Sequence, residues 1–247
     1  MSRKLNKIFV TTIRTPIDNI VNRLEQLELP YEVDYEILQG VVGRNTDIEY
    51  KEYDGWGMEY NEDEPQTDWW SRPMTDGEVG CALSHYKMMK QAYDEGHEWV
   101  MFLEEDFFAQ RSLSDLDLNT FGGDVDGFYL GRFRVEGYGE DEVPYNECWL
   151  TPTFSFNTHA YCLHRRAIET IINGDFINNL IPFDDFFAST YANHLRDDVA
   201  ELFPPYLNII ACDPDYIDQM SEEDDSMTED LQGNYFNKIL NENEDGV

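Results

Sequence analysis

The sequence predicts an α/β fold with a mostly parallel central sheet. Segments with the pattern of β-strands alternate with segments of helical periodicity along most of the chain, which is the order typical of α/β proteins. The apolar run at residues 99–103 is continuous, as in a strand that is covered on both faces. The length of 247 residues suits one domain, which we expect to span residues 1–220.

The chain opens with a predicted strand, helix and strand. Residues 7–12 have the pattern of a strand, and residues 16–27 place Ile20 and Leu24 at helical spacing. Residues 31–38 form the next predicted strand. An insertion at about residues 44–74 then breaks the pattern with interleaved acidic and aromatic side chains. Such a segment indicates a lid or acceptor-binding loop or, equally, a solvated insertion.

A long helix is predicted after this insertion. Thr75 and Glu78 have the spacing of a capping box, apolar side chains follow on one helical face, and Gly96 ends the helix. The buried strand at 99–103 comes next and leads into three acidic residues. We further expect strands at 127–130, 160–163 and 207–211, helices at 165–172 and 182–195, and an acidic tail at 221–247.

Charge and composition exclude several classes of protein. The chain has 17 Lys and Arg against 51 Asp and Glu, a net charge of −34, which opposes nucleic-acid binding and adhesion to anionic membranes. No apolar run is long enough for a signal peptide or a membrane span, so we expect a cytoplasmic protein, whether of a cell or of a virus-infected host. Cysteines 81, 148, 162 and 212 form no paired motif and are expected to be buried free thiols.

The strongest chemical signal is the sequence Glu104-Glu105-Asp106 directly after the buried strand. Ligands of open α/β sheets bind at the carboxyl ends of strands. Because side chains alternate along an extended segment, Glu104 and Asp106 project together while Glu105 points elsewhere. Two such carboxylates repel unless a hard cation such as Mn²⁺ or Mg²⁺ lies between them. The alternative interpretation is a solvated acidic turn.

Several motifs together resemble glycosyltransferase family 25, which includes lipopolysaccharide and collagen galactosyltransferases. The block Gly-Glu-Val-Gly-Cys-Ala-Leu-Ser-His at residues 77–85, and Phe-Leu-Glu-Glu-Asp at 102–106, are similar to the family signature, with Glu105 in place of an aspartate. Downstream, residues 159–167 and Pro-Phe-Asp-Asp at 182–185 resemble other family segments. The resemblance covers roughly residues 7–215.

The resemblance implies a GT-A-type, Rossmann-like glycosyltransferase fold. It implies that Mn²⁺ or Mg²⁺, held by Glu104 and Asp106, bridges the diphosphate of a sugar nucleotide. It also assigns residues to the donor site. These are Thr11, Arg14, Ser84, His85, Glu104 and Glu105.

The implied reaction transfers a hexose, galactose or glucose, from a UDP-sugar to a hydroxyl of a saccharide, a lipid-linked saccharide or a protein. Inversion of the anomeric centre requires a base, for which Asp184 and Asp185 are the candidates. Their alternative role is to stabilise a helix N-terminus. A second hypothesis is a non-catalytic acidic protein that binds a sugar or a partner on a degenerate transferase fold. A third is a surface protein whose acidic residues collect cations.

Overall fold

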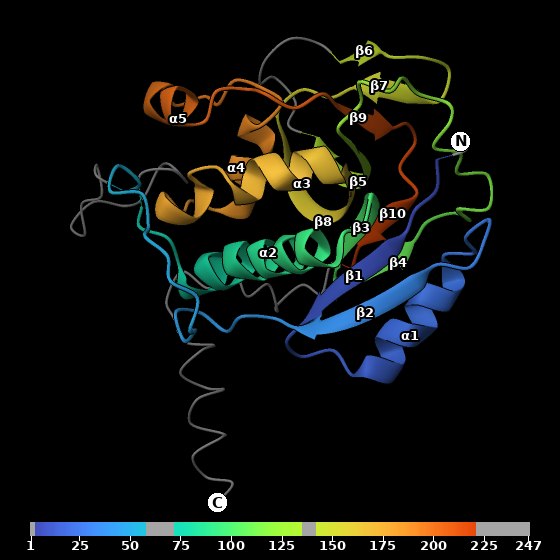
Figure 1. The fold of residues 1–247 in the computed structure, drawn as a ribbon, viewed down its shortest axis with the longest axis horizontal. Coiled ribbons are helices and arrows are strands. Elements are labelled where there is room, and N and C mark those ends of the chain that lie inside the picture. Colours follow the sequence, from blue (N-terminus) through green and yellow to red (C-terminus); the bar gives the residue numbers. More distant parts are fainter. Residues whose placement is uncertain (1–2, 58–71, 135–141, 221–247) are drawn as a thin grey trace, which may run out of the picture.

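The computed structural model describes residues 3–57, 72–134 and 142–220, and it confirms the α/β class (Figure 1). The large sheet is mixed and has the strand order β2-β1-β3-β8-β5-β9-β7-β6. Strand β1 pairs in parallel with β2 and β3, and β5 pairs in parallel with β9, whereas β8 lies antiparallel between β3 and β5. The strands are β1 (Lys7–Thr12), β2 (Asp34–Gln39), β3 (Trp99–Glu104), β4 (Phe107–Ala109), β5 (Gly127–Arg134), β6 (Val143–Pro144), β7 (Trp149–Thr151), β8 (Ser155–His164), β9 (Ile209–Cys212) and β10 (Ile217–Gln219).

Helices cover both faces of this sheet. Helices α2, α3 and α4 lie on one side, and α1 lies on the other (Figure 1). Strand β3 alternates between the two cores, since Phe102 packs in the cluster with α2 whereas Leu103 packs in the cluster with α1. The helices are α1 (Ile17–Gln26), α2 (Asp76–Glu95), α3 (Arg165–Ile172), α4 (Phe183–Ser189) and α5 (Asp197–Leu202), with a 3₁₀ turn at Phe176–Asn178.

Helix α2 begins and ends as its sequence predicts. The capping box of Thr75 and Glu78 is present, and Gly96 closes the helix with φ of +81°. Glu78 is also held by a buried bidentate ion pair with Arg72, at 2.8 Å for both contacts. A Cβ at Gly80 would lie 2.5 Å from the carbonyl oxygen of Val41, so this glycine lets α2 approach the segment after β2 closely.

The predicted helix over residues 182–195 is shorter than expected. It ends at Ser189, and a separate helix, α5, begins at Asp197. The hydroxyls of Ser189 and Thr190 donate to the carbonyl oxygens of Phe186 and Phe187, at 2.6 and 2.7 Å. Hydroxyls that bond back to the preceding turn compete with continued helix formation, which explains the early end.

The described part of the insertion packs against the C-terminal half of the chain. The backbone N–H of Tyr53 donates to Leu180, and Trp56 is buried in the core. Residues 58–71 of the insertion and the predicted tail at 221–247 lie outside the described residues. All four cysteines are free as expected, but Cys148 is exposed and Cys81 is only partly buried. Among the described residues, no helix has the length and apolarity needed to cross a membrane.

Candidate functional site

Two acidic residues lie where β3 ends. Glu104 is the last residue of β3, and it follows Val100 and Phe102 on the face of the sheet that α2 covers. Its neighbour in β1 is Thr11, which brings that predicted donor residue beside it. Asp106 follows in the turn before β4. Glu104 and Asp106 are both partly exposed and interact electrostatically.

A third carboxylate joins this pair from helix α4. Asp184 accepts hydrogen bonds from the Thr158 hydroxyl at 2.7 Å and from the backbone N–H of Asn157 at 3.0 Å. The same Thr158 hydroxyl oxygen lies 3.3 Å from Glu104 Oε1. Thr158 of β8 therefore connects Asp184, in the first turn of α4, to Glu104 at the end of β3.

A chain of side-chain contacts also links Asp184 to Asp106. Gln219 of β10 donates from Nε2 to Asp106 Oδ2 at 2.7 Å and accepts from Asn157 Nδ2 at 2.9 Å. Asn157 has φ of +61°, a conformation that non-glycine residues adopt rarely and that is often found at functional sites. A Cβ at Gly131 would overlap the carbonyl oxygen of Ile217, so this glycine allows β10 to cross β5 closely enough for Gln219 to reach the acids.

Burial and the charge of Glu104 perturb the other two carboxylates. Burial, followed by the charge of Glu104, raises the pKa of Asp106 to about 7 and that of Asp184 to about 6. Burial would also raise the pKa of Glu104, but the hydrogen bond from His85 and the nearby histidine charges bring it below its ordinary value. Asp106 Oδ1 is buried and has no hydrogen-bond partner among the described residues. A cation would satisfy both the charge and this oxygen.

His85 lies beside the carboxylates on α2. Its Nε2 is 3.2 Å from Glu104 Oε1, and its Nδ1 is 2.9 Å from the Tyr161 hydroxyl. The ring stacks on Phe183 at a centroid distance of 4.1 Å and is fully buried. One turn earlier on α2, the thiol of Cys81 completes a group with His85 and Glu104 whose ligand atoms all lie within 4.8 Å of one another.

Glu105 points to a different structure, the loop between β1 and α1. Its carboxylate accepts hydrogen bonds from the hydroxyl of Thr12 at 2.6 Å and from the backbone N–H groups of Ile13, Arg14 and Thr15 at 2.8 to 3.0 Å. Burial opposes ionisation, but these hydrogen bonds lower the pKa of Glu105 overall. Arg14 is exposed and lies 3.5 Å from the same carboxylate. Glu105 therefore holds the loop that carries Arg14.

Two other predicted residues have local structural partners. Ser84 is buried, accepts from the backbone N–H of Val41 and donates to the carbonyl oxygen of Gly80. Asp185 is fully buried with its Oδ1 3.1 Å from His194 Nε2. Of the two candidate bases, Asp184 is thus the one beside Glu104. The predictions did not include Cys81 or three residues whose contacts arise only in the folded chain. These three are Asn157, Thr158 and Gln219.

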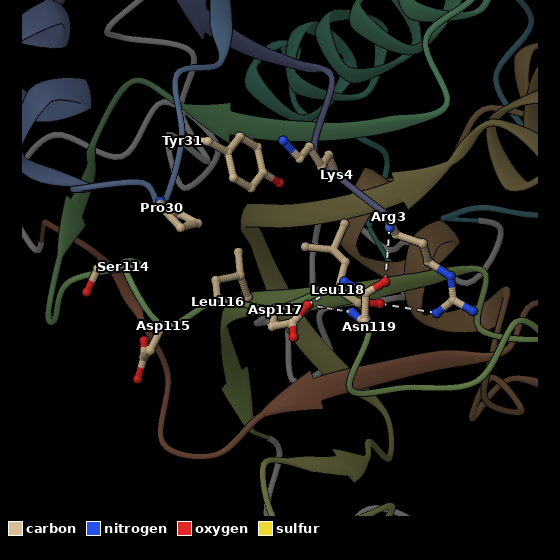
Figure 2. Close-up of a pocket in the computed structure, with 10 residues that line it drawn as sticks. All are labelled: Arg3, Lys4, Pro30, Tyr31, Ser114, Asp115, Leu116, Asp117, Leu118 and Asn119. Carbon is tan, nitrogen blue, oxygen red and sulfur yellow. Dashed lines mark hydrogen bonds between the residues drawn. The ribbon is translucent and has the colours of Figure 1, made fainter. Parts of the chain in front are cut away.

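A cavity of about 250 Å³ lies elsewhere, near the start of β1 (Figure 2). Arg3 in its wall donates to the carbonyl oxygens of Leu118 and Phe121, and Asp117 accepts from Asn119. These polar groups have partners within the chain, and the cavity contains none of the predicted site residues. The carboxyl end of β3 therefore remains the candidate site.

Comparisons with known proteins find similarity to glycosyltransferases. Residues 6–121 match the family model "Glycosyltransferase family 25 (LPS biosynthesis protein)". Procollagen galactosyltransferase 1-B of Xenopus laevis is 27% identical over 194 residues, which is 73% of this chain and 30% of that protein. A glycosyltransferase 25 family member of Anopheles gambiae is 30% identical over 129 residues, 50% of this chain and 22% of that protein. The chain thus spans less than a third of the length of these relatives.

Two glycosyltransferases are among the solved structures that are similar to this chain. A Drosophila galactosyltransferase in complex with manganese, UDP-Gal and xylobiose has a TM-score of 0.44 at 10% identity, covering 94% of this chain and 79% of that one. A glycosyltransferase involved in glycosylation of the major capsid of PBCV-1 has a TM-score of 0.41 at 10% identity, covering 85% and 83%. Both scores are low, so the fold rests on the elements described above. The resemblance to glycosyltransferase family 25 is confirmed by the family match at residues 6–121 and by the curated relatives.

Proposed function

We propose that this chain is a metal-dependent glycosyltransferase that moves a hexose, galactose or glucose, from a UDP-sugar to a hydroxyl acceptor with inversion. One observation carries the proposal: Glu104, Asp106 and Asp184 gather at the carboxyl end of β3, on segments that resemble the family motifs. The galactosyltransferases among the relatives support the reaction class. The GT-A-type fold and the donor are parts of the same proposal.

Glu104 and Asp106 suit Mn²⁺ or Mg²⁺. Both offer carboxylate oxygens, which are the ligands hard cations prefer. The buried Asp106 Oδ1 lacks a partner among the described residues. Burial, and after it the charge of Glu104, raise the pKa of Asp106, and a bound cation would offset both effects. A bound cation would offset the negative charge that develops on the diphosphate as the sugar leaves. Gln219 orients Asp106, and Glu105 holds the loop of Arg14 next to the donor position.

Asp184 is the better candidate for the base. It is partly exposed, whereas Asp185 is fully buried against His194 and is out of reach of an acceptor. Burial and the neighbouring Glu104 charge raise the pKa of Asp184 to about 6. A base whose pKa lies close to the working pH takes up a proton most effectively. Thr158 and Asn157 fix the direction of its carboxylate.

The alternative is a protein that binds a sugar or a partner without catalysis. Two departures from the family pattern motivate this alternative: Glu105, which stands where the family has aspartate, and the altered N-terminal strand. The contacts of Glu105 with the loop after β1 give this residue a structural role that does not depend on the metal. This favours the enzyme over the alternative, and the assay below separates the two.

Release of UDP from UDP-galactose and UDP-glucose, with and without Mn²⁺, tests the proposal. We expect metal-dependent release by the native chain and none by Asp106→Asn with the fold retained. Asp34→Asn is a matched control, because Asp34 is exposed at the start of β2. Unchanged release and metal dependence in Asp106→Asn would exclude Asp106 as a ligand. Binding of a UDP-sugar by the native chain without any release would favour the non-catalytic protein.

A further inference from the structure

Cys81 is a partly exposed thiol beside the carboxylates that the proposed transfer does not use. Cys81 and His85 are one helical turn apart on α2 and therefore share a face of the helix. That face meets the end of β3, where the thiol, the imidazole and the carboxylate of Glu104 bring their ligand atoms within 4.8 Å of one another.

These three groups differ in chemistry from the carboxylate pair. Thiolate, imidazole and carboxylate together are ligands of Zn²⁺ and Co²⁺, whereas Mg²⁺ and Mn²⁺ favour oxygen ligands. We infer that Cys81, His85 and Glu104 form a second cation site, which takes Zn²⁺ or a similar thiophilic divalent cation and shares Glu104 with the carboxylate pair.

The imidazole is already oriented for such a site. Stacking on Phe183 fixes the plane of the ring, and Nε2 points at Glu104 while Nδ1 faces the Tyr161 hydroxyl. When Nε2 binds the cation, Nδ1 carries the ring proton and donates a hydrogen bond to the Tyr161 oxygen. Metal-bound histidines usually have a partner of this kind on the other ring nitrogen.

The charges around the thiol also favour a cation. Burial and the neighbouring carboxylates, Glu104 and Asp184 first, raise the pKa of Cys81 well above its ordinary value. The same negative charges attract a divalent cation, whose own charge then stabilises the thiolate. Binding forms the metal–sulfur bond and releases the thiol proton to solvent.

Sharing of Glu104 has a consequence for the proposed enzyme. Because one carboxylate cannot be fully available to both sites, Zn²⁺ at Cys81 and His85 weakens the binding of Mn²⁺ at Glu104 and Asp106. Zn²⁺ therefore acts as an inhibitor that Mn²⁺ relieves. This consequence rests on the proposed function, whereas the cation site itself does not.

Cobalt absorption tests the site directly. We expect Co²⁺ added to the metal-free chain to give a thiolate-to-cobalt charge-transfer band, which Zn²⁺ then abolishes. Cys81→Ser loses the band, and Cys148→Ser, a change at the exposed cysteine, keeps it. Tyr161→Phe keeps the band but weakens Zn²⁺ binding about 10- to 100-fold. A missing band in the native chain, or a band that survives in Cys81→Ser, overturns the inference.

A second measurement needs no substitution. Zn²⁺ is expected to slow alkylation of Cys81 by a maleimide, followed peptide by peptide, and to leave alkylation of Cys148 unchanged. Equal rates at Cys81 with and without Zn²⁺ contradict the site. If UDP with Mn²⁺ still stabilises the chain in that case, the second cation site fails alone and the proposed function stands.

Discussion

Asp106→Asn is expected to stabilise the metal-free chain while it removes binding of the metal. Asp106 is desolvated beside Glu104, and its pKa rises from 3.8 to about 7 in the folded state. The unfolded chain therefore loses this proton at a lower pH than the folded chain does. It follows that the charge of Asp106 destabilises the fold progressively from about pH 4 to pH 7, and fully above pH 7.

The size of the effect follows from the pKa shift. A shift of about 3 pH units corresponds to a cost of about 4 kcal/mol at pH 8, and to roughly 2 kcal/mol at pH 5, where the folded carboxyl is mostly protonated. For a chain of this length, 1 kcal/mol moves Tm by about 2 °C or more. We therefore expect Asp106→Asn to raise Tm by about 8 °C at pH 8 and by about 4 °C at pH 5.

Thermal unfolding in the presence of EDTA, and then in the presence of Mn²⁺, measures these changes in Tm. Mn²⁺ is expected to raise Tm of the native chain at pH 8 and to leave Asp106→Asn unchanged. Asp34→Asn, an exposed carboxylate at the start of β2, serves as the control and moves Tm by less than about 1 °C at either pH. A lower Tm for Asp106→Asn at pH 8 in EDTA, or an equal gain with Mn²⁺ in both chains, would refute the reasoning.

Four further substitutions test the base, the metal-binding carboxylate and the loop after β1 separately. Asp184→Asn is expected to lower kcat about 100-fold or more while the fold is retained. Asp185→Asn is expected to lower the free energy of unfolding by about 1 to 3 kcal/mol, because it weakens the buried contact with His194. UDP release and urea denaturation compare the two variants, and equal kcat values would contradict Asp184 as the base. Gln219→Leu removes the donor to Asp106, the proposed metal ligand, and is expected to weaken Mn²⁺ binding about 10-fold or more in titrations. Gln26→Leu, at an exposed glutamine of α1, is the control and is expected to leave Mn²⁺ binding unchanged. Glu105→Gln leaves the fold intact but lowers the free energy of unfolding by about 1 to 3 kcal/mol, since one carboxylate oxygen accepts several hydrogen bonds from the loop. The urea midpoint then falls, and an unchanged midpoint would contradict the structural role of Glu105.

Much of the fold was predictable because its signals are local. The capping box at Thr75 and Glu78, the left-handed Gly96 and the continuous apolar run before Glu104 each act within a few residues. The helix after Pro182 was predicted six residues too long, since apolar periodicity does not register how a hydroxyl at Ser189 bonds to the backbone of its own helix.

The acids of the candidate site could be proposed from the sequence, whereas the residues that contact these acids could not. Glu104 and Asp106 follow a buried strand, so the sheet itself brings them to the site. Asn157 and Gln219 are 62 positions apart in the sequence, and their side chains meet only in the folded chain. No local sequence pattern predicts that contact. The direction in which Glu105 points was predicted from strand alternation, but its loop partners depend on the β1–β3 pairing.

The proposed donor site is tested most directly by thermal unfolding with UDP, GDP, CMP or dTDP, each with and without Mn²⁺. A ligand at one hundred times its dissociation constant adds about 2.7 kcal/mol of stability, which raises Tm by several degrees for a chain of this length. We predict a shift that requires UDP and Mn²⁺ together and that is absent in Asp106→Asn. No shift with any pair of nucleotide and metal would contradict a sugar-nucleotide site at Glu104 and Asp106.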